Sequence, residues 1–147
     1  MQRGFSLIEI MVTIAILIML AASVAAVSFS YLRNQQVRSA SDAIVAELLL
    51  AQTNAYAQTH DAGHGIMVFT DRVIRFEGDT YASRVEAEDV TTLFSTIVAL
   101  SGISEVNFLN GSLSPVVSGT ITLESNETAM DITISPYGVV QTTARAI

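Results

Sequence analysis

The distribution of apolar residues divides the chain into a short N-terminal part and a longer remainder. From Ile10 to Leu32 no side chain is charged, and the next ionic residue is Arg33. A helix rises ~1.5 Å per residue, so this run reaches about 35 Å and can cross a bilayer core of about 30 Å. The pattern therefore predicts a transmembrane helix over residues 5–32 and a globular domain over residues 33–147.

Helical spacing continues beyond the apolar run. Apolar residues recur at intervals of three and four and form one stripe, which comprises Val37, Ile44, Leu48, Ala51 and Ala55, with Val45, Leu49 and Tyr56 beside it. Such a stripe is typical of a helix that packs one face against a domain. We expect one long helix that ends at Gly63 and Gly65, because glycine favours helix termini.

The rest of the chain has the two-residue period of β-strands. Segments 66–70 and 73–76 flank Asp71-Arg72 and predict a hairpin, and the acidic stretch 78–89 predicts a loop. Further strands are predicted at 91–100, 106–109 (ending in the Asn110-Gly111 turn), 120–124, 131–135 and, after a turn at Gly138, from Val139-Val140 onward. Each alternating strand has one apolar and one polar face. The predicted fold class is α+β, with a long N-terminal spine helix and a small antiparallel sheet packed on its outer half.

A single carboxylate, Glu9, lies at the start of the apolar run, behind a leader of four residues that contains Arg3. A charge near the start of a membrane helix costs on the order of 1–3 kcal/mol, so Glu9 requires a function that compensates for it. Because basic residues stay in the cytoplasm, Arg3 places the leader on the cytoplasmic side and the domain outside the cytoplasm.

These residues resemble a known N-terminal signal. The segment that opens the helix, Gly4-Phe5-Ser6-Leu7-Ile8-Glu9, resembles the class III leader of the type IV pilins and type II secretion pseudopilins. The resemblance implies that a prepilin peptidase removes residues 1–4 by cutting after Gly4, and methylates the new N-terminus at Phe5. It also implies that Glu9 faces the N-terminal amine of a neighbouring subunit in a filament. There the two charges neutralise one another, whereas each alone is penalised.

Two other interpretations of the N-terminus predict different products. A secretory signal peptide would be cut near Val24-Ala25-Ala26, but its apolar core has about 7–15 residues and Glu9 lies where that pathway excludes acids. A plain membrane anchor would leave Glu9 without a function. The mass of the mature protein separates the three interpretations.

A finer resemblance covers residues 35–145. The Ala-rich helix at 47–57 and the ending at 132–140 resemble the H-type minor pseudopilins, whose domain also occurs in minor pilins of type IV pili and DNA uptake. In the DNA-binding members a Gly-Arg-x-Arg sequence follows the last turn. Here that position reads Gly138-Val139-Val140-Gln141, and Arg145 is the only cation nearby.

Composition argues against nucleic acid as a partner. The formal charge is −7, and removal of Arg3 with the leader makes it one unit more negative. An acidic domain repels the phosphate backbone at long range. There is no cysteine, so the single small domain is held by packing rather than by disulfides.

Candidate metal and catalytic residues are few. His60 and His64 have the four-residue spacing of a helical zinc pair, but Gly63 and Gly65 interrupt the helix, and we interpret both as solvent-exposed turn histidines. Glu86, Glu88 and Asp89 could hold calcium, but a solvated acidic loop is the simpler interpretation. No nucleophile–base pair or phosphate-binding loop is present, so we expect no enzyme activity, no cofactor and no metal.

The sequence thus predicts a structural minor pilin or pseudopilin subunit. Its expected partners are the bacterial inner membrane, a prepilin peptidase and other subunits that contact its N-terminal helix. The subunit would assemble into an inner-membrane-anchored type II secretion pseudopilus or a type IV pilus. The alternative is a surface-exposed minor pilin that binds DNA for uptake.

Overall fold

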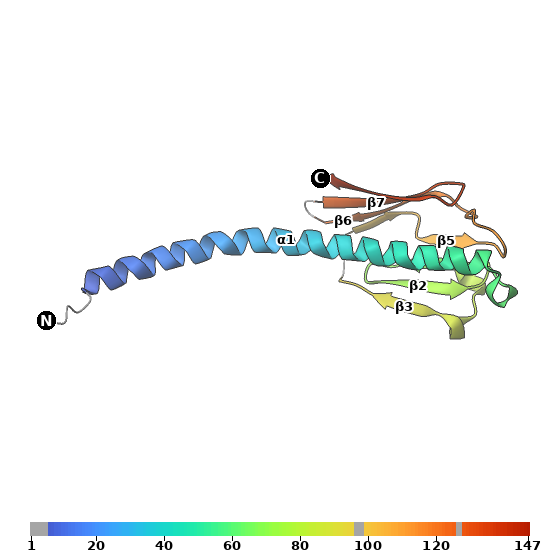
Figure 1. Cartoon of the computed structure of the whole chain (residues 1–147), viewed down its shortest axis with the longest axis horizontal. Coiled ribbons are helices and arrows are strands. Elements are labelled where there is room, and N and C mark those ends of the chain that lie inside the picture. The colour runs from blue at the N-terminus through green and yellow to red at the C-terminus, as the bar shows by residue number, and fades with distance from the viewer. Residues whose placement is uncertain (1–5, 96–98, 126–127) are drawn as a thin grey trace. The chain divides into compact units, whose positions relative to one another are not determined.

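The computed structural model describes residues 6–95, 99–125 and 128–147, and gives the backbone alone for residues 23–31 and 33. The chain divides into two compact units, Met1–Arg33 and Asn34–Ile147. One 50-residue helix, α1 (Leu7–Tyr56), contributes to both (Figure 1). Together with the antiparallel strands of the second unit, this helix confirms the α+β fold class.

The buried face of α1 in the second unit follows the predicted stripe. Six apolar side chains of this face are at most 2% exposed: Val37, Ala40, Ile44, Leu48, Ala51 and Ala55. Of the three residues predicted beside the stripe, Val45 packs partly buried against the core, whereas Leu49 and Tyr56 are 44% and 59% exposed. Successive helical residues are 100° apart, which turns Leu49 away from the face that Leu48 buries.

The helix ends earlier than predicted. α1 stops at Tyr56, and Gln58 then adopts a left-handed conformation with φ 55° before the short 3₁₀ helix η1 (Thr59–Asp61). Gly63 lies beyond this turn, where a Cβ atom would come within 2.7 Å of Asp79 Oδ1. Gly63 therefore permits a close approach between two segments and does not terminate the helix.

The first sheet has the strand order β3-β2-β1-β5 and is antiparallel throughout. Its strands are β1 (His64–Val68), β2 (Arg72–Glu77), β3 (Val90–Leu93) and β5 (Glu105–Phe108). β1 and β2 form the predicted hairpin, with Val68 opposite Val73. The predicted acidic loop between β2 and β3 contains two short 3₁₀ helices, η2 (Tyr81–Ser83) and η3 (Glu86–Glu88).

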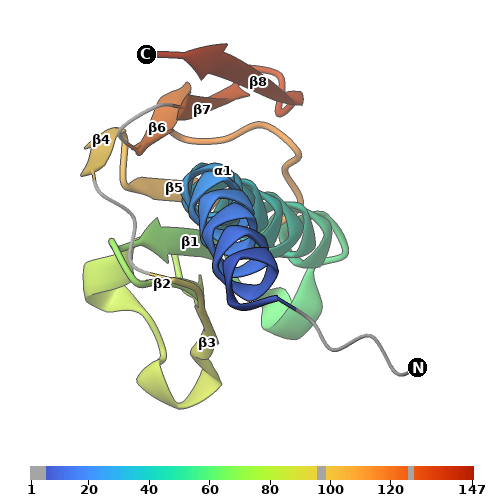
Figure 2. The same cartoon turned by 90° about the vertical axis from the view of Figure 1, so that its left-hand side faces the viewer.

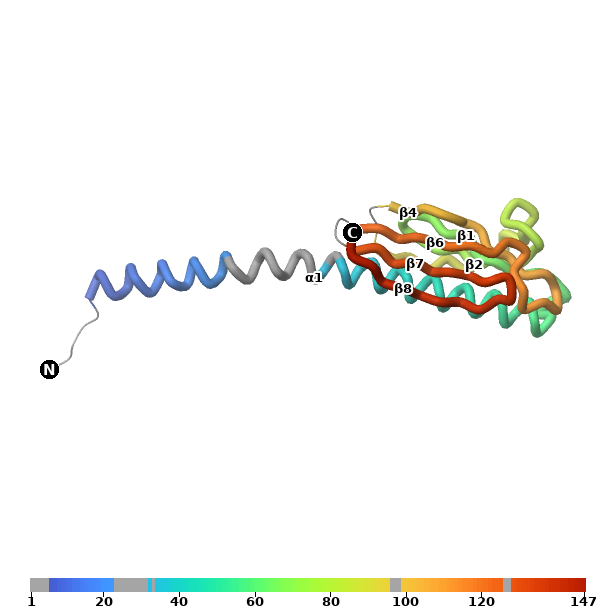
Figure 3. Tube along the Cα trace, turned by 90° about the horizontal axis from the view of Figure 1, so that it is seen from above, coloured from blue at the N-terminus to red at the C-terminus, as the bar shows by residue number. Residues whose placement is uncertain are grey.

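The second sheet has the order β4-β6-β7-β8 and is also antiparallel. Its strands are β4 (Ala99–Gly102), β6 (Gly119–Glu124), β7 (Thr128–Ile134) and β8 (Val140–Ala146), and β8 forms one edge (Figure 3). The strands predicted at 120–124, 131–135 and after Gly138 are confirmed. Gly138 has φ 79°, and a Cβ atom there would collide with the carbonyl oxygen of Leu113.

The structure corrects two features of the predicted sheet. The described strands form two four-stranded sheets instead of one, and the strand predicted at 91–100 is divided into β3 and β4, which belong to different sheets. Residues 96–98, between them, lie outside the described part of the chain. The alternation of apolar and polar residues is the same in either sheet, so the pattern does not record where the chain changes its hydrogen-bonding partner.

The helix joins both sheets in one hydrophobic core (Figure 2). The stripe of α1 packs with Ile66, Val73 and Phe108 of the first sheet and with residues of the second that include Ile121, Leu123 and Ile132. Polar contacts reinforce this packing. The Glu47 carboxylate on α1 accepts hydrogen bonds from Arg75 Nε (2.9 Å) and Thr92 Oγ1 (2.7 Å).

Two adjacent leucines test this packing, because their side chains are identical and their surroundings differ. Leu48→Ala should lower the free energy of unfolding by about 3 kcal/mol, since it leaves a cavity in the core. Leu49→Ala, at a half-exposed position, should cost less than about 1 kcal/mol. Urea unfolding of the full chain in detergent measures both values. Equal losses for the two variants would contradict the assigned buried face.

Candidate functional site

The start of α1 positions the acid that the sequence analysis singled out. The Ser6 carbonyl oxygen accepts hydrogen bonds from the backbone N–H groups of Glu9 (3.1 Å) and Ile10 (3.3 Å), so the helix begins directly after Ser6. Glu9 therefore lies in the first turn. Unsatisfied N–H groups and the positive end of the helix dipole favour a carboxylate there. Gly4 and Phe5 lie outside the described residues, so cleavage and methylation at these positions stay predictions.

An apolar surface extends along this part of the helix. Between Leu7 and Leu20 the large hydrophobic side chains are exposed, from 45% at Ile10 to 79% at Leu7. Consecutive helical positions point in all directions, so this surface surrounds the helix instead of forming one stripe. A helix that is hydrophobic on every side is normally buried in lipid or among other helices. The segment thus requires an apolar environment from outside the chain.

The polar groups within this surface differ in whether they have a partner. The Thr13 hydroxyl donates to the carbonyl oxygens of Glu9 (2.8 Å) and Ile10 (2.9 Å), as expected of a hydroxyl in an apolar helix. Within the described residues, Glu9 forms no ion pair. The arrangement therefore offers one carboxylate, in the first turn of an apolar helix, to a cation from elsewhere.

No helix within the described stretches combines the length and the apolarity that crossing a membrane requires. The predicted span at residues 5–32 includes Phe5 and the side chains of residues 23–31, which lie outside that description. The span stays a prediction.

The two histidines do not behave alike. His60 is exposed, as predicted, and its Nδ1 lies 2.6 Å from Glu77 Oε2, which raises the pKa of His60 through this hydrogen bond and the nearby charge. His64 is 4% exposed, so its predicted exposure is wrong. Because α1 ends early, His64 falls within β1, and its Nε2 lies 3.1 Å from the Thr59 carbonyl oxygen. The two imidazoles do not share a helical face.

The acidic loop holds an arginine. Arg84 Nε donates to Asp89 (2.9 Å), and Arg84 Nη2 donates to Glu86 (3.1 Å). Two of the three acids considered for calcium are therefore paired with a guanidinium group. Glu88 lies apart from them, near His60 and Glu77.

The cation that follows the last turn in the sequence is also paired. Arg145 on β8 donates through Nε to Asp131 (3.1 Å) on β7 and through Nη2 to Glu124 (3.3 Å) on β6. Its guanidinium group links the strands of the second sheet and faces carboxylates. This arrangement weakens any attraction of Arg145 to phosphate.

The comparisons with known proteins bear on the N-terminal segment. Residues 1–25 match the family described as prokaryotic N-terminal methylation motif. No curated protein and no solved structure matches the chain. Helix packed against antiparallel sheets is the typical architecture of pilins. The chain thus carries the N-terminal methylation motif of type IV pilins and pseudopilins, a class of structural, non-enzymatic proteins. The motif implies processing by a prepilin peptidase, membrane anchoring and filament assembly.

The pairing of Asp131 predicts a pH dependence of stability. A hydrogen bond from the Thr122 hydroxyl, with a further contribution from Arg145, lowers the pKa of Asp131 below its ordinary value of 3.8. Because the pKa of Asp131 is lower in the folded state than in the unfolded state, the ionised carboxylate stabilises the fold at any pH above the unfolded-state pKa. This stabilisation is lost as the pH falls through the folded-state pKa. The wild type should therefore exceed Asp131→Asn in urea midpoint at pH 7, and the difference should shrink below about pH 4. A difference that is constant with pH would contradict this assignment.

Proposed function

We propose that this chain is a structural minor pilin or pseudopilin subunit. A prepilin peptidase trims it after Gly4 and methylates Phe5, and the mature chain assembles through its N-terminal helix into an inner-membrane-anchored type II secretion pseudopilus or type IV pilus. The observation that carries the proposal is the apolar surface around Leu7–Leu20, with Glu9 as a carboxylate in its first turn.

Assembly then exchanges one apolar environment for another. Before assembly, lipid covers the exposed side chains, and in the filament the helices of neighbouring subunits replace it. Because lipid tails are as apolar as leucine, this exchange has little hydrophobic driving force and specifies no unique alignment of the helices. A polar contact is needed to set the register along the filament axis.

Glu9 and the new N-terminus supply that contact. Cleavage after Gly4 creates an amine at Phe5, which can pair with a carboxylate in its ammonium form. An unpaired carboxylate and an unpaired ammonium group are each penalised in an apolar environment, and pairing relieves both penalties. Since each subunit has one of each, pairing between neighbours repeats along a filament and fixes the register. Trimming must precede assembly, because the uncut chain has no amine at Phe5.

The acidic domain supports a structural role over DNA capture. Arg145, the cation that follows the last turn in the sequence, is bonded to Asp131 and Glu124, and the chain has a formal charge of −7. Phosphate contacts from basic side chains dominate affinity for DNA. A structural subunit is therefore favoured over one that captures DNA, and the assignment as a minor subunit rests on the resemblance of residues 35–145 to the H-type pseudopilins.

The role of Glu9 is tested by Glu9→Ala. The variant should insert into the membrane normally, because the helix becomes more apolar, and should be absent from filaments, because the pairing carboxylate is lost. Membrane fractionation and immunoblotting of sheared filaments from the native host measure the two properties. Thr13→Val is the matched control on the same helix, and it should be incorporated, since the hydroxyl bonds only its own backbone. Normal incorporation of Glu9→Ala would refute the proposed role.

Processing is tested by the intact mass of the protein from its native host. The wild type should lack its first four residues and carry one added methyl group, whereas Gly4→Val should retain them because a bulky side chain blocks the peptidase. Ser6→Ala, just beyond the cleavage point, serves as the control and should be trimmed. A wild-type product that keeps residues 1–4, or that lacks about 26 residues as after signal-peptidase cleavage, would overturn the proposal.

A further inference from the structure

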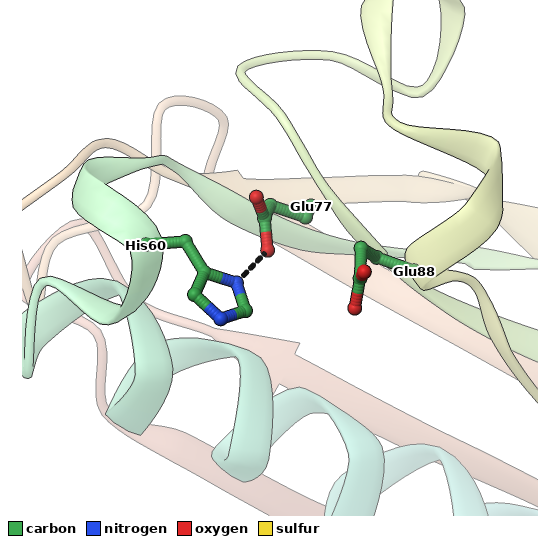
Figure 4. Close-up of side chains that lie close together, drawn as sticks. All are labelled: His60, Glu77 and Glu88. Atoms are coloured by element: carbon green, nitrogen blue, oxygen red, sulfur yellow. Dashed lines mark hydrogen bonds and ion pairs between the residues drawn. The ribbon is translucent and has the colours of Figure 1, made fainter.

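Three potential metal ligands converge at one end of the first sheet (Figure 4). His60 comes from η1, Glu77 from the end of β2, and Glu88 from η3. One ligand atom from each side chain lies within 4.8 Å of the other two. This convergence is separate from the N-terminal helix and has no part in the proposed assembly.

The charges in this cluster do not balance. Two carboxylates lie near one imidazole, which carries at most one positive charge. Within the described residues, neither Glu77 nor Glu88 forms an ion pair with an arginine. Arg75 is close enough to line the same hollow, but its Nε is bonded to Glu47. The cluster therefore retains negative charge, which favours a divalent cation over a single proton.

The hollow has room for an ion and bound water. Its volume is about 110 Å³, and its lining includes the three side chains of the cluster. One water molecule occupies about 30 Å³ in the liquid, so a hydrated cation fits there. Glu77 is 13% exposed and His60 is 62% exposed, so Glu77 is held in place while His60 is free to adjust.

The required adjustment is small. Ligand atoms that bind zinc at about 2.0–2.2 Å in a tetrahedral arrangement lie roughly 3.3 Å apart. The His60–Glu77 pair, now at 2.6 Å, would open by less than about 1 Å. The most distant pair, at no more than 4.8 Å, would close by about 1.5 Å. Side-chain rotations of the exposed residues His60 and Glu88 accomplish both changes without moving a strand.

We propose that His60, Glu77 and Glu88 bind one divalent transition-metal cation of the Zn²⁺ type, with water in the fourth position. An imidazole with two carboxylates is a donor set that Zn²⁺ accepts. Ca²⁺ instead requires about six to eight oxygen ligands, more than these side chains supply. The bound ion would tie the turn after α1 to the connection between β2 and β3.

Calorimetric titration of the tag-free, chelator-treated full chain in detergent tests the site, with ZnCl₂ and CaCl₂ as the probes. One Zn²⁺ should bind per chain, and Ca²⁺ should bind at least about tenfold more weakly. Zn²⁺ binding should weaken at least about tenfold in each of the variants His60→Gln, Glu77→Gln and Glu88→Gln. Mutating a residue that only hydrogen-bonds to a metal ligand already lowers the affinity by about this factor. Glu86→Gln is the matched control, because it makes the same charge change in η3 at a residue bonded to Arg84. It should bind Zn²⁺ as the wild type does.

The outcomes separate a metal site from general acidity. The proposal would be overturned if the wild type did not bind Zn²⁺, or if it bound Ca²⁺ more strongly than Zn²⁺. It would also be overturned if the Glu86→Gln and Glu88→Gln variants bound Zn²⁺ equally and both differed from the wild type. Glu88 lies on an exposed turn, so the metal-free Glu88→Gln variant should show the circular dichroism and melting temperature of the wild type. Visible absorption of the Co²⁺-loaded chain adds a second readout. Its d–d bands should be lost in the His60→Gln variant, and unchanged bands would contradict coordination by this imidazole.

Discussion

The packing of one narrow face of α1 against two sheets is the interaction on which the domain depends. The described strands form two separate hydrogen-bonded sheets, and one hydrophobic core contains side chains from the helix and from both sheets. Ala40, Ala51 and Ala55 are fully buried on this face, and their small side chains let the strands approach the helix closely. Ile44 and Leu48 fill the space between them. This combination of small and large side chains gives the dense packing that stabilises a domain without disulfides.

The distribution of apolar side chains around α1 differs between its two parts. In the second unit it hides one stripe of apolar side chains, and between Leu7 and Leu20 it exposes apolar side chains on every side. A stripe is satisfied by the chain's own sheets, whereas an apolar cylinder needs lipid or other helices. The domain is therefore built from contacts within one chain, and the proposed function assigns contacts with other molecules to the N-terminal segment. In the proposed assembly, Glu9, in the first turn, adds the polar contact that apolar packing lacks.

Composition makes the domain acidic, and tertiary structure decides which of its charges are paired. Arg75, Arg84 and Arg145 each bond to carboxylates, so these cations stabilise the fold and are not presented to an anionic ligand. Glu77 and Glu88 have no such partner among the described residues. The His60 imidazole lies beside them, and Arg75, which lines the same hollow, is bonded to Glu47. The negative charge of this surface repels phosphate and attracts metal ions, so the surface favours a cation over a nucleic acid as ligand.

The sequence by itself determined the features that depend on the local spacing of apolar and polar residues. The stripe from Val37 to Ala55, the β1–β2 hairpin and the alternating strands β6 and β7 follow from spacing alone, and the N-terminal motif places Glu9 at the helix start. The roles of Gly4 and Phe5 remain predictions from that motif. Tertiary structure decided where α1 ends, how the segment at 91–100 divides between two sheets, and that His64 is buried while His60 meets Glu77 and Glu88. The physical reason is that a repeat records which face of an element is apolar, whereas the choice of partner depends on packing between residues that are distant in the chain.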